Sequence, residues 1–156
     1  EVPVINSFSP KKQLPLQGGT GLSLSLTRIN PPTLPDASTL GYSQITTVEP
    51  GRLAFISGQV ASRTSGEPAP DDLAEQAELV IQNAKAALGA VGASAEDLVM
   101  VRVYVVDLSP ERLQIVMPYL HTLFDGTEPS LTGVGVAALA GPNLQLEIEM
   151  VARLQS

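Results

Sequence analysis

The stretch that decides the fold runs from residue 98 to residue 107 and reads LVMVRVYVVD. It is rich in valine, and apolar residues occur at positions that would face both sides of a sheet. A strand that is covered on both faces has this nearly continuous apolar pattern. We therefore predict a central strand from Leu98 to Asp107 and read the chain outward from it.

A long helix is predicted before the central strand. It begins near Asp71 and Asp72, whose charges suit the positive end of a helix dipole, and it ends at Gly92. Apolar residues recur along this segment at helical spacing, at Leu73, Ala77, Val80, Ala84 and Leu88. They form one stripe, which we expect to pack on the sheet.

A second helix is predicted after the central strand. Ser109 is a suitable N-cap and Pro110 fits the first helical position, so the helix begins there and runs toward Phe124. Pro118 lies inside it and is expected to kink the helix or to shorten its first part.

Four other segments have the pattern of strands, at residues 41–48, 52–58, 131–138 and 144–154. The turn signal Glu49-Pro50-Gly51 predicts that the first two form a hairpin. The resulting order, β-β-α-β-α-β-β, predicts an α+β fold in which a mixed sheet carries both helices on one face. In a single chain the other face of the sheet would be exposed to solvent. Because only 16% of the residues are charged, we expect this face to be buried by self-association.

The amino-acid composition argues against several classes of function. The chain has 156 residues, which suits one domain, and its formal charge of −7 argues against binding to phosphate backbones. It has no cysteine and one histidine, so we expect no disulfide and no transition-metal site, although carboxylates alone could hold magnesium or calcium. We expect no cofactor. No apolar run approaches the roughly 18 residues of a membrane span, so we expect a soluble protein without a membrane partner.

The N-terminal region differs from the rest. Residues 1–27 are rich in proline and glycine and are predicted to be an extension, whereas residues 28–156 form the domain. The strictly alternating run from Leu22 to Leu26 has the pattern of an edge strand. We expect a cytoplasmic protein, or an exported, periplasmic one if the glutamate at position 1 reflects a cleaved signal peptide.

The last predicted strand carries two carboxylates. Alternation directs its apolar residues toward the helices, and these are Leu146, Ile148, Met150 and Ala152. Glu147 and Glu149 then lie together on the helix-free face. A carboxylate that loses hydration in a cleft has a raised pKa and suits a general base. The alternative is that both are solvated or paired with arginines such as Arg102 or Arg153.

Four short motifs resemble one known family. They are Gly41-Tyr42-Ser43-Gln44, Ser57-Gly58-Gln59, Gly135-Val136-Ala137-Ala138-Leu139 and Leu146-Glu147-Ile148-Glu149. Their order and spacing, from about Arg28 to Leu154, resemble the RidA/YjgF family of reactive-intermediate (imine/enamine) deaminases. The resemblance implies a chorismate-mutase-like fold, a homotrimer whose sheets line a central barrel, and small-molecule clefts at the subunit interfaces.

The resemblance also implies roles for single residues. The family's catalytic glutamate, which positions the water that attacks the imine carbon, corresponds to Glu147, and its cleft tyrosine corresponds to Tyr42. Backbone at Gly58 and along the strand from Gly133 to Val136 would line the pocket.

One position departs from the family pattern. The family's Pro-x-Arg-Ser/Thr motif reads Pro129-Ser130-Leu131-Thr132 here, so Leu131 replaces the arginine that binds the substrate carboxylate. Gly133 stands where relatives often have cysteine. Loss of a bidentate charge-assisted contact costs about 2–5 kcal/mol of binding free energy. This argues against the archetypal deamination of 2-imino acids and places the chain in an arginine-lacking branch.

Two functions therefore remain open. The chain is a hydrolase or deaminase acting on a C=N bond, with Glu147 activating water, or it is a non-catalytic trimeric protein that binds a small molecule. The family's older association with RNA cleavage is disfavoured by the charge of −7.

Overall fold

The predicted central strand is present in the computed structural model, which describes residues 26–155. It forms β4 (Leu98–Val106), which lies between two other strands of a four-stranded sheet. The remaining elements in chain order are β1 (Leu26–Ile29), β2 (Ile45–Val48), β3 (Leu53–Gln59), α1 (Leu73–Ala90), α2 (Pro110–Phe124), β5 (Ser130–Val136) and β6 (Leu146–Arg153). Short 3-10 turns at Ser38–Leu40 and Ala95–Asp97 precede β2 and β4.

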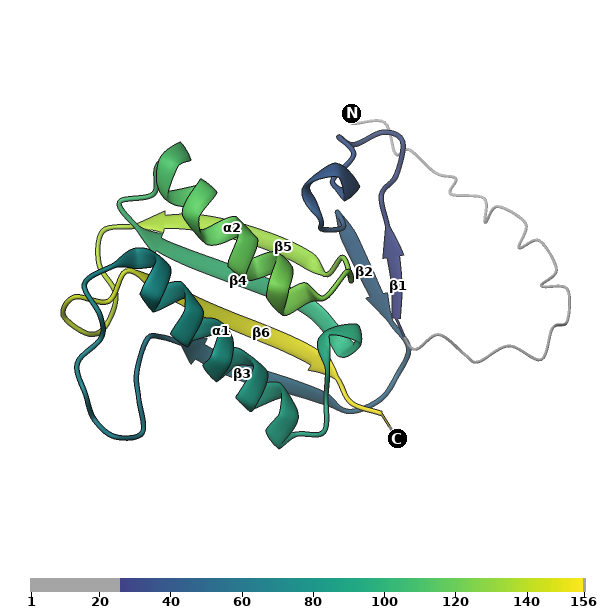
Figure 1. Ribbon diagram of the computed structural model, residues 1–156. Coiled ribbons are helices and arrows are strands. Elements are labelled where there is room, and N and C mark those ends of the chain that lie inside the picture. Colours follow the sequence, from purple (N-terminus) through teal and green to yellow (C-terminus); the bar gives the residue numbers. More distant parts are fainter. Residues whose placement is uncertain (1–25, 156) are drawn as a thin grey trace, which may run out of the picture.

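The main sheet has the strand order β3-β6-β4-β5, and both helices cover the same face of it (Figure 1). β4 and β5 are parallel, whereas β6 is antiparallel to both β3 and β4. The predicted α+β class, with two helices on one face of a mixed sheet, is therefore confirmed.

The predicted hairpin between residues 41–48 and 52–58 is wrong. β2 pairs with β1 in a separate two-stranded sheet, whereas β3 pairs with β6. The turn between β2 and β3 is instead held by Arg153 of β6, whose guanidinium donates hydrogen bonds to the carbonyls of Glu49 (3.1 Å) and Pro50 (3.0 Å). The turn thus leads from one sheet into the other.

β1 adds one strand to the predicted order. It begins at Leu26, the last residue of the alternating run 22–26, and the rest of that run lies outside the described residues. Most of the predicted N-terminal extension, residues 1–25 of 1–27, also lies outside them.

Both helices begin where the sequence predicts. The Asp72 side chain accepts a hydrogen bond from the Glu75 amide (2.9 Å), and the Ser109 hydroxyl accepts one from the Arg112 amide (3.2 Å). Of the two effects expected of Pro118, a kink or a shortened first part, the shortening does not occur, because α2 runs without a break from Pro110 to Phe124. Proline removes the hydrogen bond to the carbonyl four residues earlier. That carbonyl belongs to Gln114, which is exposed, so water can donate the hydrogen bond that the proline nitrogen cannot.

The core lies between the sheet and the helices. The predicted inward residues of β6 are at most 2% exposed, and these are Leu146, Ile148, Met150 and Ala152. The apolar stripe of α1 packs against them. Glu147 and Glu149 alternate with the buried set and therefore lie on the face of the sheet without helices.

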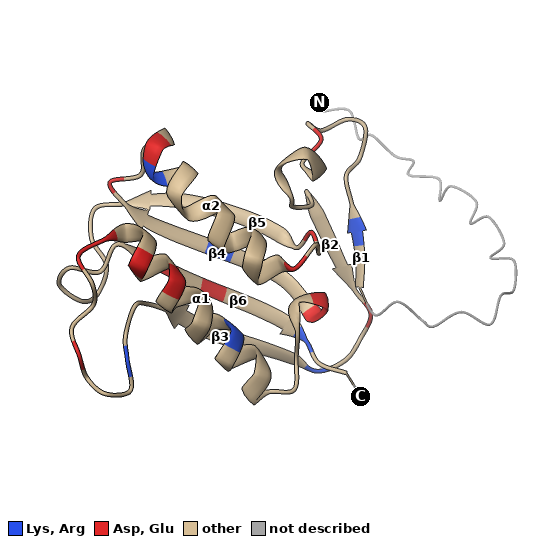
Figure 2. Cartoon of the chain, in the orientation of Figure 1, with Lys and Arg blue, Asp and Glu red and all other residues tan. Residues whose placement is uncertain are grey.

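Acidic residues occur at the N-terminal ends of both helices (Figure 2), where Glu75 and Glu111 lie in the first turns. Negative charge is favourable there because helix N-termini carry partial positive charge. Between residues 26 and 155, no helix is both long enough and apolar enough to cross a membrane.

Candidate functional site

Glu147 and Gly58 lie in direct contact across β3 and β6. The pairing register shifts between Ile56 and Gln59, so that two residues of β3 face a single residue of β6. This bulge brings Gly58 against the Glu147 side chain. A Cβ added at Gly58 would overlap the carboxylate oxygen Oε1 and would lie 2.7 Å from Cγ. The absence of a side chain at position 58 therefore makes room for the carboxylate.

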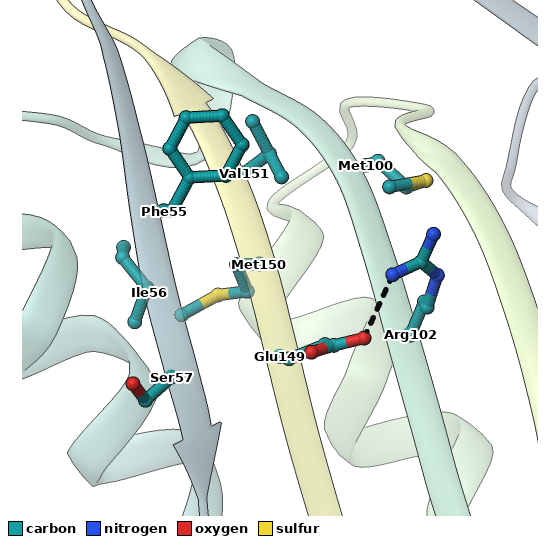
Figure 3. A pocket seen from close by; sticks show the side chains of 8 residues that line it. All are labelled: Phe55, Ile56, Ser57, Met100, Arg102, Glu149, Met150 and Val151. Atoms are coloured by element: carbon teal, nitrogen blue, oxygen red, sulfur yellow. Dashed lines mark hydrogen bonds and ion pairs between the residues drawn. The ribbon is translucent and has the colours of Figure 1, made fainter.

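Glu149, two residues further along β6, is held by β4. Its Oε1 accepts hydrogen bonds from the Tyr104 hydroxyl (2.7 Å) and from Arg102 Nη1 (2.9 Å, Figure 3). These bonds, first that of Tyr104 and then that of Arg102, lower the pKa of Glu149. Glu149 is thus an ionised, paired carboxylate, and the expectation of pairing with Arg102 is confirmed for this residue.

Glu147 has different surroundings. It is half-buried, and within residues 26–155 no hydrogen bond or ion pair reaches its carboxylate. Its cross-strand neighbour on β4 is Tyr104, but the Tyr104 hydroxyl donates to Glu149. Among the described residues the Glu147 carboxylate therefore has no hydrogen-bond donor, whereas Oε1 of Glu149 has two.

The helix-free face beside Glu149 is hollowed and largely apolar. A depression of about 370 Å³ is lined by Phe55, Met100 and Val151 together with the Arg102–Glu149 pair (Figure 3). Phe55 is 78% exposed in the single chain. Large exposed apolar surface of this kind marks a contact site for another molecule.

Two of the predicted pocket residues lie on the other face of the sheet. Leu131 and Gly133 of β5 are opposite Val101 and Val103 of β4, which are buried under the helices. Leu131 packs against the core on that side. A single chain therefore does not bring Leu131 or Gly133 together with Glu147.

The two remaining predicted residues are also apart from Glu147. Val136, the last residue of β5, is opposite Val106 and so shares the helix-free face with Glu147, but β4 lies between β5 and β6. Tyr42 is half-buried and precedes Ser43, which bridges to the first residue of β5, Ser130. Of the predicted site, one chain thus assembles only Glu147 and Gly58.

Tyr104 was not among the residues predicted for the site. The available signal was that positions 102 and 104 are the polar ones in an otherwise apolar strand, two residues apart and therefore on one face. Among residues 26–155 there is no group of three or more side chains suited to hold a metal ion.

Comparison with known proteins decides the family. The family model described as Endoribonuclease L-PSP matches residues 34–154. The RutC family protein YjgH of Escherichia coli is 36% identical over 109 residues, which are 69% of this chain and 79% of that protein. The chain belongs to the RidA/YjgF family.

Other RidA/YjgF proteins are similar to this chain in fold and in sequence. The crystal structure of YyfB from Yersinia pestis, described as a conserved Rid family protein of unknown function, has a TM-score of 0.78 and 36% identity. The match covers 83% of this chain and 99% of YyfB. TdcF of Escherichia coli, named a putative reactive intermediate deaminase, is 31% identical over 106 residues, which are 67% of this chain and 81% of TdcF.

Proposed function

We propose that this RidA-family chain forms a homotrimer with small-molecule clefts at its subunit interfaces, where Glu147 activates water to hydrolyse an imine or enamine. The observation that carries the proposal is the contrast between two neighbouring carboxylates. Glu149 is engaged by Arg102 and Tyr104, whereas Glu147 is half-buried beside Gly58 without a partner in the described chain. The deaminase name of the relative TdcF supports the same chemistry.

Water is the only co-reactant that the hydrolysis needs. Glu147 accepts a proton from water as the water oxygen forms a bond to the imine carbon, and the C=N electron pair moves to nitrogen, which takes up a proton. The resulting carbinolamine loses its C–N bond and releases ammonia, which leaves a carbonyl compound. An enamine enters the same route after protonation at carbon.

A site between subunits fits the arrangement of the chain. Glu147 and Gly58 lie on the helix-free face, whereas Leu131 and Gly133 lie on the helix side of β5, an edge strand. In a closed assembly, the β5 edge of one protomer can meet the helix-free face of the next. The exposed Phe55 on that face supports such a contact.

Leu131 determines the class of ligand that we propose. A leucine cannot pair with a carboxylate, so we expect an uncharged imine to be preferred over a 2-imino acid. Tyr42 and the backbone of Gly58, Gly133 and Val136 would line the cleft, in keeping with the family resemblance.

The test compares Glu147→Gln with Glu78→Gln, which removes an exposed glutamate of α1. The probes are an uncharged imine, made from benzylamine by a flavin amine oxidase, and a carboxylated imine, made from L-leucine by an amino-acid oxidase. We expect Glu147→Gln to lower turnover of the uncharged imine about 100-fold or more. Equal turnover by both variants would exclude Glu147 as the base.

The Leu131 substitution also favours a second candidate, a trimeric binding protein without catalysis. It predicts that small C=N compounds raise the melting temperature while no imine is turned over by the wild type. Light scattering tests the shared premise, because a monomer in solution would contradict both functions.

A further inference from the structure

The charged and phenolic side chains of the described helix-free face form one small group. β4 contributes Arg102 and Tyr104, and β6 contributes Glu147 and Glu149. β3 and β5 add no titratable side chain to this face. Arg153, at the end of β6, is turned to the carbonyls of Glu49 and Pro50.

The four residues are connected diagonally. In the register of β4 and β6, Arg102 is opposite Glu149 and Tyr104 is opposite Glu147. Arg102 bonds straight across, but the Tyr104 hydroxyl reaches diagonally to the same Oε1 of Glu149. Glu149 therefore receives both donors and Glu147 receives neither.

We propose that Arg102 and Tyr104 are positioning residues that occupy Glu149 and so leave Glu147 as the carboxylate that binds water and exchanges a proton. The inference rests on the proposed function of Glu147. The archetypal chemistry needs one working carboxylate, but this strand presents two on one face, two residues apart. Because Glu149 is paired with Arg102 and Tyr104, Glu147 is left as the carboxylate that acts as the base.

The charge balance explains why the pairing matters. With Arg102 present, the pair of carboxylates and the arginine carry a net charge of −1 when all are ionised. Without it, two like charges share the face, and each favours protonation of the other.

The experiment measures the titration of Glu147 directly in the full chain. The side-chain carboxyl is followed by carbon-13 NMR, with the resonance assigned through Glu147→Gln. Arg102→Met is compared with Arg102→Lys and with Arg52→Met, which removes an exposed arginine outside the group. We expect Arg102→Met to move the midpoint of Glu147 upward by about 0.5–1 pH unit, Arg102→Lys to move it less, and Arg52→Met to leave it in place.

Kinetics give a second readout. If the protein turns over the uncharged imine, the acidic midpoint in the pH profile of kcat/KM should move to higher pH in Arg102→Met by the same amount as the NMR midpoint. If no variant turns over an imine but the midpoint still shifts, the hydrolase function fails and the electrostatic role of Arg102 stands. The two outcomes are therefore distinguishable.

Two results would overturn the inference. One is a Glu147 midpoint that moves no further in Arg102→Met than in Arg52→Met. The other is a selective rise in KM for the carboxylated imine with an unchanged midpoint, because Arg102 would then bind substrate. If Arg102→Met does not fold, Glu149→Gln provides the test, since removing the like charge should lower the Glu147 midpoint.

Discussion

The carboxylate of Glu147 occupies the space that a side chain at position 58 would need. A Cβ on Gly58 would overlap Oε1 and lie 2.7 Å from Cγ of Glu147. Gly58 does not have a positive φ angle, unlike Gly41 and Gly66. Its lack of a side chain therefore matters for the close approach of β6, not for backbone conformation.

Gly58→Ala is expected to displace Glu147. The added methyl group cannot be accommodated without movement of the carboxylate or of the bulge, so turnover of the uncharged imine should fall at least about tenfold. Overpacking of this kind costs about 1–3 kcal/mol of folding free energy. Turnover and urea denaturation of the same preparation measure the two effects.

Gly89→Ala is the matched control for this substitution. A Cβ at Gly89 would meet no atom within 4 Å, and the residue lies inside α1. Alanine is the better helix former, so stability should rise by up to about 1 kcal/mol and turnover should stay unchanged. Equal turnover in Gly58→Ala and Gly89→Ala would contradict a role for the Gly58–Glu147 contact.

Stability should depend on Glu149 at acidic pH. The hydrogen bonds from Tyr104 and Arg102 lower the pKa of this carboxyl in the folded chain. The unfolded chain then binds the proton more readily, so the contribution of Glu149 is present above its unfolded pKa, near 4.3, and is lost as pH falls through the folded pKa. Melting temperatures between about pH 3 and pH 6 should therefore fall less steeply for Glu149→Gln than for wild type.

Glu78→Gln controls for the loss of a carboxylate, and its melting temperature should fall between about pH 6 and pH 3 as steeply as that of wild type. If the melting temperatures of Glu149→Gln and wild type fall equally steeply over this range, the pairing of Glu149 does not contribute to acid stability.

Local patterns in the sequence were sufficient to predict β4, the buried face of β6 and the starts of both helices. The apolar run of β4, the alternation of β6 and the caps Asp72 and Ser109 are all found where predicted. These features depend on neighbours in the chain, which the sequence displays directly.

Features that depend on pairing between distant strands were not predictable in this way. The turn at Glu49-Pro50-Gly51 signals a change of direction but not which strand pairs with which. The Gly58–Glu147 contact arises from a bulge between strands some ninety residues apart. The face of Leu131 follows from the register of β5 on β4.

Leu131→Arg should shift the substrate preference from the uncharged imine toward the carboxylated imine. A guanidinium at this position can bind a carboxylate bidentately, so the carboxylated imine made from L-leucine should gain at least about tenfold in kcat/KM relative to the uncharged one. Leu131 packs against the core, so the variant should also lose about 1–3 kcal/mol of stability. An unchanged preference in a folded trimer would place Leu131 outside the ligand cleft.

Leu131→Lys is the informative companion to this variant. It supplies the charge without the planar pair of donors, so its gain should be smaller than that of arginine. Equal gains would indicate that charge alone, and not bidentate geometry, sets the preference.

Gln76 holds the start of β6 and should be needed for the stability of the site. Its fully buried amide donates to the carbonyls of Pro70 and Asn143 (both 2.7 Å) and accepts from the Gln145 amide (2.9 Å), just before β6 begins. Gln76→Ala leaves these three backbone groups without their partner, which should cost about 2–4 kcal/mol of unfolding free energy.

Gln82→Ala, at an exposed position of the same helix, is the control and should change stability by less than about 0.5 kcal/mol. Because Gln145 leads directly into the strand that carries Glu147, Gln76→Ala should also lower turnover at temperatures where the protein is still folded. If Gln76→Ala lowers stability but leaves turnover at the Gln82→Ala level, the buried amide supports the fold without positioning Glu147.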